Sequence, residues 1–389
     1  SVELETKNGE SIILTIDAEM QSKLFSIIEG VVSGRGFKAG SGIIIDVRTG
    51  EVLTATSFPE FDSGILSRNS SPEEVASYLT SESKPFFFRA LEGLYAPGSI
   101  FKTIIALGAL SEKIIDPARQ ILSTGSISIP NPYFPDQPSV FFDWKAHGWV
   151  DMRQALAVSS NVYFYTVGGG FGDQTGLGVK KIVDYAKRMG LSTSVGVELA
   201  ESDGFLPTPE WKEKNNPADP VWRIGDTYNL SIGQGMIQVT PLQMATVATI
   251  IARDGVKPDI HLIKTLLFED GSEIKTKPDS DKKIDIPSEA YFVVKEGMRQ
   301  AAEFGTASAL SGLGVEVAGK TGTAELGAEK KKVNSWFIGF LPYKNPKIAM
   351  VIVLEAGSSQ NLVGAPYAAR ELVSWIVYNR KELINNPQF

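Results

Sequence analysis

The sequence contains no cysteine and only two histidines, His147 and His261. Without cysteine, the chain can form neither a disulfide framework nor a thiolate nucleophile. A Ser-His-Asp hydrolase or a multi-histidine metal site would need one of these histidines in a suitable setting. Neither histidine lies in a Gly-x-Ser-x-Gly or His-Glu-x-x-His motif, so neither class of protein is favoured.

A strong charge of one sign and a long apolar run are also missing. The 38 Lys and Arg against 45 Asp and Glu give a net charge of −7 without a basic cluster, so a nucleic-acid partner is not expected. No stretch reaches the roughly 18 to 20 apolar residues that span a bilayer. The segment from Ser1 to Lys7 is polar and gives no sign of a signal peptide. If the natural protein has a membrane anchor, we expect that anchor to lie outside these 389 residues.

Apolar periodicity predicts strands towards both ends of the chain and helices between them. The expected strands are Ser11–Ile16, two within Gly40–Ser57, Val315–Glu325, Ser335–Leu341 and Lys347–Glu355. The expected helices cover 18–32, 152–167, 180–189, 240–253, 288–303 and 366–378, with a further short helix after Pro72. The segments 111–149 and 204–229 are expected to be irregular because they are rich in proline. This order predicts an α+β fold, with an antiparallel sheet built from both ends (about 1–110 and 256–389), flanking helices and a mainly helical insert (about 111–255).

One serine stands where a turn leads into an apolar helix. Pro97 and Gly98 deliver Ser99 to the start of this helix, and Lys102 follows three residues later on the same helical face. A serine nucleophile needs a neighbouring base, and a lysine can serve when burial or a second cation disfavours its charged form. The Ser-x-x-Lys pattern occurs four times, but the other three copies lie in charged, Pro-flanked or Gly-flanked stretches that indicate solvated surface. The Ser99 copy is therefore the candidate for chemistry.

Two further motifs place polar residues among apolar ones. Ser-x-Asn occurs three times, and the copy at Ser159 and Asn161 lies within an expected helix. A catalytic role and a simple hydrogen bond from the serine back to its own helix both remain open there. Lys320-Thr321-Gly322 occurs once, in an expected strand. Its glycine indicates the close approach of another backbone or a ligand, although a kink at the strand edge would also explain it.

The three motifs, in this order, resemble the set found in penicillin-binding proteins and class A β-lactamases. Nearly the whole chain is similar to the transpeptidase domain of class B penicillin-binding proteins, and it fits best with the elongation-type penicillin-binding protein 2. The division-type branch is the alternative. The resemblance rests on Leu14–Asp17, Asp46–Glu51, Tyr95–Lys102, Asn229–Gly235, Val239–Ala245, Gly319–Glu325 and Ser335–Phe340. The elongation-type assignment rests on Ser159–Tyr165 and Gly225–Ser231.

This resemblance implies a penicillin-binding/β-lactamase-like transpeptidase fold and an enzyme that crosslinks peptidoglycan stem peptides through a serine acyl-enzyme. Ser99 would be the nucleophile, with Lys102 as its base. Ser159 would relay a proton, and Asn161 and Lys320 would complete the catalytic group. The expected substrate-binding residues are Thr321, Gly322 and Thr323, and the expected oxyanion hole consists of the backbone N–H groups of Ser99 and Thr323. β-Lactams would acylate the same serine, and no cofactor is implied.

The resemblance also implies a location and partners. The domain would act at the outer, periplasmic face of the bacterial cytoplasmic membrane, held by an N-terminal anchor and a pedestal that lie outside this sequence. Its partners would be a D-Ala-D-Ala donor, an amine acceptor and, for the full-length protein, a membrane glycosyltransferase and elongation scaffold proteins. Some elongation-type members bind zinc, with a cysteine among the ligands, near the segment that matches Asp143–Gly148. Because this chain offers only Asp143 and His147 there, structural packing is the favoured interpretation and no metal is expected.

Two other classes of protein share these motifs. A β-lactam hydrolase or D,D-carboxypeptidase would use the same serine but pass the acyl group to water, and the sequence shows no clear Glu or Asp motif for activating a water molecule. A non-catalytic β-lactam sensor would keep the fold, with less reason to keep all three motifs.

Overall fold

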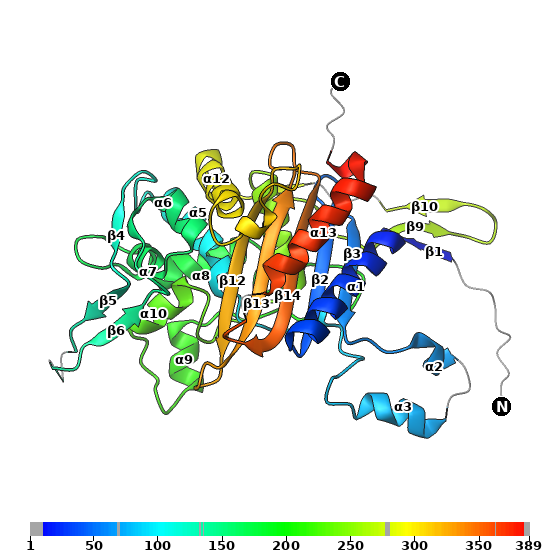
Figure 1. The fold of residues 1–389 in the computed structure, drawn as a ribbon, viewed down its shortest axis with the longest axis horizontal. Helices are drawn as coiled ribbons and strands as arrows, with labels where there is room; N and C mark the ends of the chain where they lie inside the picture. Colours follow the sequence, from blue (N-terminus) through cyan, green and yellow to red (C-terminus); the bar gives the residue numbers. More distant parts are fainter. Residues whose placement is uncertain are drawn as a thin grey trace.

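A five-stranded antiparallel sheet forms the centre of the molecule (Figure 1). The computed structural model describes residues 11–67, 71–131, 134, 136–276, 281–361 and 363–384. The strand order is β12–β13–β14–β2–β3, with β2 Ala39–Asp46, β3 Val52–Phe58, β12 Ala318–Leu326, β13 Lys332–Leu341 and β14 Ile348–Ser358. Strand β14 pairs with β2, so the two ends of the chain meet in the middle of the sheet. The expected α+β fold, with a sheet built from both ends, is confirmed.

Each face of this sheet is covered by helices because successive side chains of a strand point to opposite faces. Helices α1 Ala18–Arg35 and α13 Ala365–Asn379 lie against one face, where they pack on Ile44 and Ile352. Helix α11 Pro241–Ala252 packs on the other face, with Ile43 and Val351. Helix α12 Ser288–Glu303 lies beside β12 and has the bounds that the sequence predicts.

The helix starts follow local signals that the sequence carries. The Asp17 side chain accepts a hydrogen bond from the backbone N–H of Met20 and caps α1, as expected. Thr240 and Gln243 form the expected capping box of α11, with Pro241 in its first turn. These side chains bond backbone N–H groups that no helical carbonyl could reach, so they determine where each helix begins.

The insert contains more regular structure than the sequence analysis expected. Segment 111–149 was expected to be irregular, but it forms two antiparallel pairs: β4 Ile121–Ser123 with β7 Gly148–Val150, and β5 Ser126–Ile129 with β6 Ser139–Phe142. The expectation fails because the prolines between Pro130 and Pro138 lie between strands β5 and β6 and leave the pairing intact. Segment 204–229 was also expected to be irregular, and it contains helices α9 Pro209–Asn215 and α10 Ile224–Ser231. Proline in the first turn of α9, after the Thr208 cap, starts that helix rather than breaking it.

The expected helix over 152–167 is wrong as a single element. Two helices occupy this stretch, α6 Met152–Val158 and α7 Asn161–Gly169. Ser159 between them adopts a left-handed conformation, with φ 60° and ψ 41°, which ends α6. Ser160 then caps α7 by accepting a hydrogen bond from the backbone N–H of Tyr163.

The remaining elements surround this core. They are β1 Ser11–Leu14, α2 Ser63–Ser67, α3 Pro72–Leu79, α4 Arg89–Glu92, the 3-10 helix η1 Gly98–Phe101, α5 Lys102–Ser111, α8 Val179–Arg188, β8 Val256–Lys257, β9 Ile263–Leu267, β10 Glu273–Lys275, β11 Lys282–Lys283, and the 3-10 helices η2 Ser308–Leu310 and η3 Lys381–Leu383. Strands β1, β9 and β10 form a separate small sheet. Within the part of the chain that the structure describes, no helix combines the length and the apolar character needed to cross a bilayer. The boundaries of the insert at about residues 111 and 255 remain predictions.

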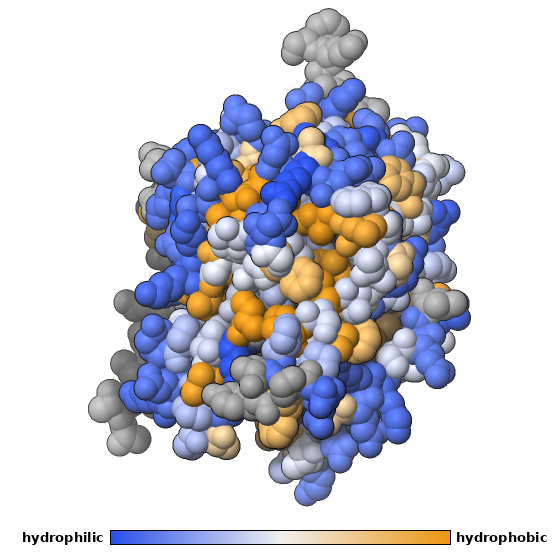
Figure 2. All heavy atoms as spheres, turned by 90° about the vertical axis from the view of Figure 1, so that its left-hand side faces the viewer, coloured by the Kyte–Doolittle hydropathy of each residue, from blue (hydrophilic) through white to orange (hydrophobic). Residues whose placement is uncertain are grey.

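Hydrophobic side chains remain visible on the insert side of the molecule. Figure 2, which views the side that lies on the left of Figure 1, shows hydrophobic atoms between patches of polar ones. The exposed large apolar side chains of β4, β6, β7 and α10 are Leu122, Val140, Phe142, Trp149 and Ile224. Phe142 lies directly before Asp143, a residue of the site described next.

Candidate active site

Ser99 lies where the chain turns from Tyr95 into α5. It belongs to η1, and Lys102 is the first residue of α5. Gly98 has a φ of +57°, and a Cβ atom there would lie 2.5 Å from the carbonyl oxygen of Thr323 in β12. A Cβ at Gly322 would lie 2.8 Å from the carbonyl oxygen of Pro97. The close backbone approach expected at Gly322 is therefore present, and it places Ser99 beside β12, the edge strand of the sheet.

Two buried lysines meet at one serine hydroxyl. Lys102 and Lys320 are both fully buried. The Nζ atom of Lys102 donates to Oδ1 of Asn161 at 2.7 Å and to the backbone carbonyl of Ser159 at 2.8 Å, and lies 3.4 Å from the Ser159 hydroxyl. The Nζ atom of Lys320 donates to the same hydroxyl at 2.9 Å and to the carbonyl of Thr321 at 2.9 Å. Residues from α5, the α6–α7 junction and β12, far apart in sequence, thus form one polar centre.

The environment weakens the positive charge of both lysines. Burial lowers the pKa of Lys102 to about 7, although the carboxylate of Asp143 partly opposes this change. Burial, together with the charge of Lys102, lowers the pKa of Lys320 well below its ordinary value. A group whose pKa lies near neutrality can accept and return a proton at working pH. The centre therefore holds a lysine suited to act as a general base.

The Ser99 hydroxyl makes no hydrogen bond to another residue that the structure describes. Lys102 instead directs its Nζ atom towards Ser159 and Asn161. Hydrogen bonds of catalytic groups are often long or poorly aligned before substrate binds. Ser99 is therefore close to Lys102 in sequence, but the expected hydrogen bond between the Ser99 hydroxyl and Lys102 is not formed.

The residues after Lys320 lie along the open edge of the sheet. Among the strands that the structure describes, β12 pairs only with β13, and Thr323 on it is exposed. Thr321 bonds through its hydroxyl to the hydroxyl of Thr306 at 2.8 Å. The sequence analysis did not identify Thr306, because this residue follows α12 without any motif that marks it. An exposed strand edge with hydroxyl groups and a nearby lysine can bind a carboxylate.

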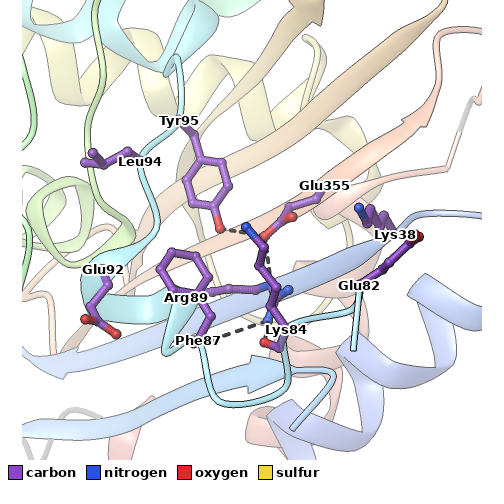
Figure 3. Close-up of a pocket in the computed structure, with 9 residues that line it drawn as sticks. All are labelled: Lys38, Glu82, Lys84, Phe87, Arg89, Glu92, Leu94, Tyr95 and Glu355. Carbon is purple, nitrogen blue, oxygen red and sulfur yellow. Dashed lines mark hydrogen bonds and ion pairs between the residues drawn. The ribbon is translucent and has the colours of Figure 1, made fainter. Parts of the chain in front are cut away.

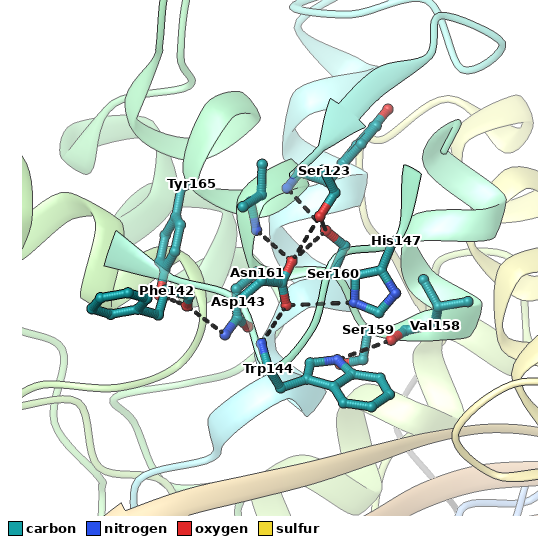
Figure 4. A network of polar contacts seen from close by, with 12 residues as sticks. Ser123, Phe142, Asp143, Trp144, His147, Val158, Ser159, Ser160, Asn161 and Tyr165 are labelled. Carbon is teal, nitrogen blue, oxygen red and sulfur yellow. Dashed lines mark hydrogen bonds and ion pairs between the residues drawn. The ribbon is translucent and has the colours of Figure 1, made fainter. Parts of the chain in front are cut away.

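The turn that carries Ser159 is held by a loop from the insert, and Figure 4 shows this network. We call residues 158–162 the Ser159 turn. A left-handed residue other than glycine costs roughly 1 to 2 kcal/mol, so this turn needs external support. Oδ2 of Asp143 accepts hydrogen bonds from the Ser160 hydroxyl at 2.7 Å, the Val162 N–H at 3.0 Å and the Ser123 hydroxyl at 3.2 Å. These contacts of Asp143 cannot be predicted from the sequence, which favours packing alone, since nothing in the local pattern links this residue to a turn some 16 residues away.

The same loop is where a metal would be sought. Nε2 of His147 lies 3.5 Å from Oδ1 of Asp143, and burial lowers the pKa of this histidine. No group of three or more His, Cys, Asp or Glu side chains that could hold a metal ion occurs among the described residues. The other groups around the carboxylate are the hydroxyls of Ser123 and Ser160 and the backbone N–H groups of Trp144 and Val162. This donor set does not fit zinc, which prefers thiolate, imidazole and carboxylate ligands.

A separate pocket of about 410 Å³ lies beside the segment that leads to Ser99 (Figure 3). Its centre is an ion pair between Arg89 and Glu355 at 2.9 Å, and the Tyr95 hydroxyl donates to Glu355 at 2.6 Å. Arg89 also donates to the backbone carbonyls of Ser83 and Lys84. None of the three motifs lines this pocket. Its polar network holds the 83–95 segment against the end of β14 and does not form part of the polar centre.

Residues 40–373 match the family model of the penicillin binding protein transpeptidase domain, and the chain belongs to this family. Among its relatives is the peptidoglycan D,D-transpeptidase MrdA of Haemophilus influenzae, which is 30% identical over 384 residues. That alignment covers 93% of this chain and 56% of the relative, so the chain spans little more than half of the relative's length. The predicted family is confirmed.

Solved structures agree with this assignment. PBP2 of Pseudomonas aeruginosa has a TM-score of 0.80 and 29% identity, and the match covers 98% of this chain and 79% of that one. PBP2 of Helicobacter pylori, solved in a complex with MreC, has a TM-score of 0.79 and 25% identity, with 96% of this chain and 64% of that chain covered. The fold is that of penicillin-binding protein transpeptidase domains, and the expected likeness to penicillin-binding protein 2 is confirmed.

Proposed function

We propose that this chain is the transpeptidase domain of a peptidoglycan D,D-transpeptidase that works through an acyl-enzyme on Ser99. The observation that carries the proposal is the meeting of two buried lysines, Lys102 and Lys320, at Ser159. Asn161 accepts a hydrogen bond from Lys102, and Ser99 lies in η1 directly before the helix that begins with Lys102. The name of the Haemophilus influenzae relative supports the same activity. The reaction class is acyl transfer from a D-Ala-D-Ala stem peptide to an amine.

Acylation begins when Oγ of Ser99 attacks the carbonyl carbon of the penultimate D-Ala. Neutral Lys102 accepts the hydroxyl proton as the C–O bond forms, and the developing oxyanion lies between the backbone N–H groups of Ser99 and Thr323. Collapse of the tetrahedral intermediate breaks the C–N bond, and Ser159 passes a proton from Lys102 to the leaving D-Ala amine. The short distance from Lys102 to Asn161, 2.7 Å, supports a role for this amide in orienting the base.

Recognition of the donor uses the edge of β12. A bound carboxylate favours the ammonium form of Lys320, whose pKa is lowered in the free protein by burial and by the charge of Lys102. The hydroxyl groups of Thr321 and Thr323 donate hydrogen bonds to the same terminal carboxylate. Gly322 allows η1 to approach this strand, because any side chain there would collide with Pro97. The exposure of Thr323 at the sheet edge supports its access to a ligand.

The second half of the reaction separates this enzyme from a hydrolase. An amine from a second stem peptide attacks the ester carbonyl, its proton passes to Lys102, and the bond to Ser99 breaks to leave a crosslink. A hydrolase of the class A β-lactamase type activates its water with a carboxylate. The side chain of Asp143, which interacts electrostatically with Lys102, is fully buried and accepts hydrogen bonds from Ser160 and Val162, so it cannot take up that role.

The role of the whole protein extends the same proposal. We place the domain in cell elongation, at the outer face of the cytoplasmic membrane, where peptidoglycan is assembled. The complex of the Helicobacter pylori PBP2 with MreC supports a scaffold partner of that kind. A membrane glycosyltransferase partner, a membrane anchor and a pedestal beyond this sequence remain predictions, and so does the division of the chain near residues 111 and 255.

Labelling with a fluorescent penicillin, followed by intact mass over hours, tests the proposal. Wild type should give a single persistent adduct, and Ser99→Ala should give none. Ser272→Ala is the matched control, because Ser272 and Lys275 repeat the Ser-x-x-Lys spacing on exposed surface. An adduct in Ser99→Ala would overturn the assignment. An adduct that disappears within seconds would point to a hydrolase, and turnover of a D-Ala-D-Ala thioester with an added amine would identify the transferase.

A further inference from the structure

Asp143 is a buried carboxylate that none of the three motifs explains. Its side chain is fully buried, as is almost all of the side chain of His147 beside it. A buried charge is costly unless hydrogen bonds and an opposite charge compensate it. Burial opposes its ionisation, but the backbone N–H groups of Asn161 and Val162 and the Ser160 hydroxyl hold the pKa of Asp143 below its ordinary value. The group is therefore a charged acceptor aimed at the Ser159 turn.

Three consecutive residues of the loop each hold a different part of this turn (Figure 4). The carbonyl of Phe142 accepts a hydrogen bond from Nδ2 of Asn161 at 3.2 Å. Asp143 holds the middle of the turn, because its carboxylate accepts hydrogen bonds from the Ser160 hydroxyl and the Val162 N–H. The indole N–H of Trp144 donates to the carbonyl of Val158 at 3.3 Å. The loop thus fixes both ends and the middle of the segment on which Ser159 stands.

The contacts of Lys102 depend on that segment. Two of its three acceptor atoms belong to Ser159, and the third is the Asn161 amide oxygen. The backbone carbonyl of Ser159 faces Lys102 while Ser159 is in the left-handed conformation, and that conformation is unfavourable for serine by itself. A displacement of the turn would move all three acceptors at once.

We propose that Asp143 is a positioning residue of the acyl-transfer site, which holds the Ser159 turn in the conformation that presents Ser159 and Asn161 to Lys102. This inference rests on the proposed function of Ser99 and Lys102. It replaces the interpretation of Asp143 as packing alone. The titratable groups around the carboxylate are Lys102, His147, whose pKa burial lowers, and, next to that histidine, Lys145. The negative charge of Asp143 also stabilises the ammonium form of Lys102.

Two substitutions separate positioning from bulk stability. Asp143→Ala removes the hydrogen bonds from the Asp143 carboxylate to the turn, and we expect the second-order rate of penicillin acylation to fall about 100-fold, the size of effect that a 1 Å misplacement produces. Asp143→Asn keeps one acceptor oxygen but loses the charge, and we expect a loss of about 10-fold, as for one hydrogen bond to a charged group. Glu201→Gln is the matched control. Glu201 also accepts three hydrogen bonds from a loop, at Val195, Gly196 and Val197, and touches no motif.

The pH profile supplies a readout that a structural role would not move. Acylation needs neutral Lys102, so the rate should rise with pH through about 7 in wild type. Asp143→Asn removes a negative charge that stabilises the ammonium form of Lys102, so the acylation rate of this variant should rise at lower pH than in wild type. Thermal melting should show that the variant is folded. Asp143→Asn with the wild-type rate and an unchanged profile would overturn the inference, whether or not Asp143→Ala folds. Failure of the proposed function would give a different result: either the wild-type protein would not be acylated, or Ser99→Ala would still be acylated.

Discussion

The polar centre has two walls that are built in different ways. The sheet wall consists of η1 and β12, where a continuous strand ladder and two glycine contacts fix the backbone. The turn wall is the Ser159 turn, which a few side-chain hydrogen bonds hold in an unfavourable conformation. Backbone ladders spread a perturbation over many bonds, whereas the turn is held by a few hydrogen bonds from one short loop and depends most on the central carboxylate of Asp143. The sheet wall should therefore tolerate side-chain changes and fail on backbone collisions, and the turn wall should show the opposite behaviour.

Removing the lysine that touches both walls should have the largest effect. Lys102→Ala deletes the base and the hydrogen bonds to Ser159 and Asn161. We expect penicillin acylation to slow about 1,000-fold, within the usual range for a general base, and to lose its rise with pH through about 7. Stopped-flow labelling between about pH 5 and pH 9 measures both the rate and its dependence on pH. A variant that keeps the wild-type pH profile would exclude Lys102 as the base.

A steric collision in the sheet wall should have the second-largest effect. Gly322→Ala places a methyl group 2.8 Å from the Pro97 carbonyl, so η1 or β12 must move. We expect acylation about 100-fold slower and a loss of about 1 to 3 kcal/mol in the free energy of unfolding. Gly34→Ala is the matched control, because that glycine lies in α1 with no atom near its Cβ position. Normal acylation of Gly322→Ala would mean that the contact between η1 and β12 does not determine the geometry of Ser99.

A side-chain change behind the sheet wall should have the smallest effect. Tyr95→Phe removes the hydrogen bond to Glu355 but leaves the ion pair with Arg89. We expect a loss of about 1 to 2 kcal/mol in the free energy of unfolding, measured by urea denaturation, and acylation within about twofold of wild type. Tyr378→Phe serves as control, because this side chain is 80% exposed. A large loss of acylation in Tyr95→Phe would make the sheet wall as sensitive to single hydrogen bonds as the turn wall.

The same contrast explains which features the sequence could predict. The sheet strands and helices α11 and α12 follow from apolar periodicity and caps, which are local signals. The break at Ser159 could not be predicted, because apolar residues continue on both sides and its support comes from Asp143, a distant residue. Proline content misled the analysis of the β5–β6 region, since the prolines lie between the strands.

The candidate site was predictable only through resemblance. Nothing in the spacing of Lys102, Asn161 and Lys320 shows that Lys102 and Lys320, from two distant segments, meet at the turn that carries Ser159 and Asn161. The structure brings these four side chains together, while the catalytic and binding roles remain proposals. Thr306 and Asp143 escaped notice because a single polar residue in a loop carries no periodic signal.

The pairing of β14 with β2 has a consequence for how the protein is made. These two strands are separated by some 300 residues of chain, and they form the middle of the sheet. The hydrophobic surfaces of β2, β3 and α1 lack their partner strands until β12, β13 and β14 are also free to fold. Contacts between such distant segments slow folding and leave apolar surface exposed to aggregation in the meantime. The amino-terminal part therefore cannot mature by itself, and the nascent chain should depend on chaperones until its last strands arrive.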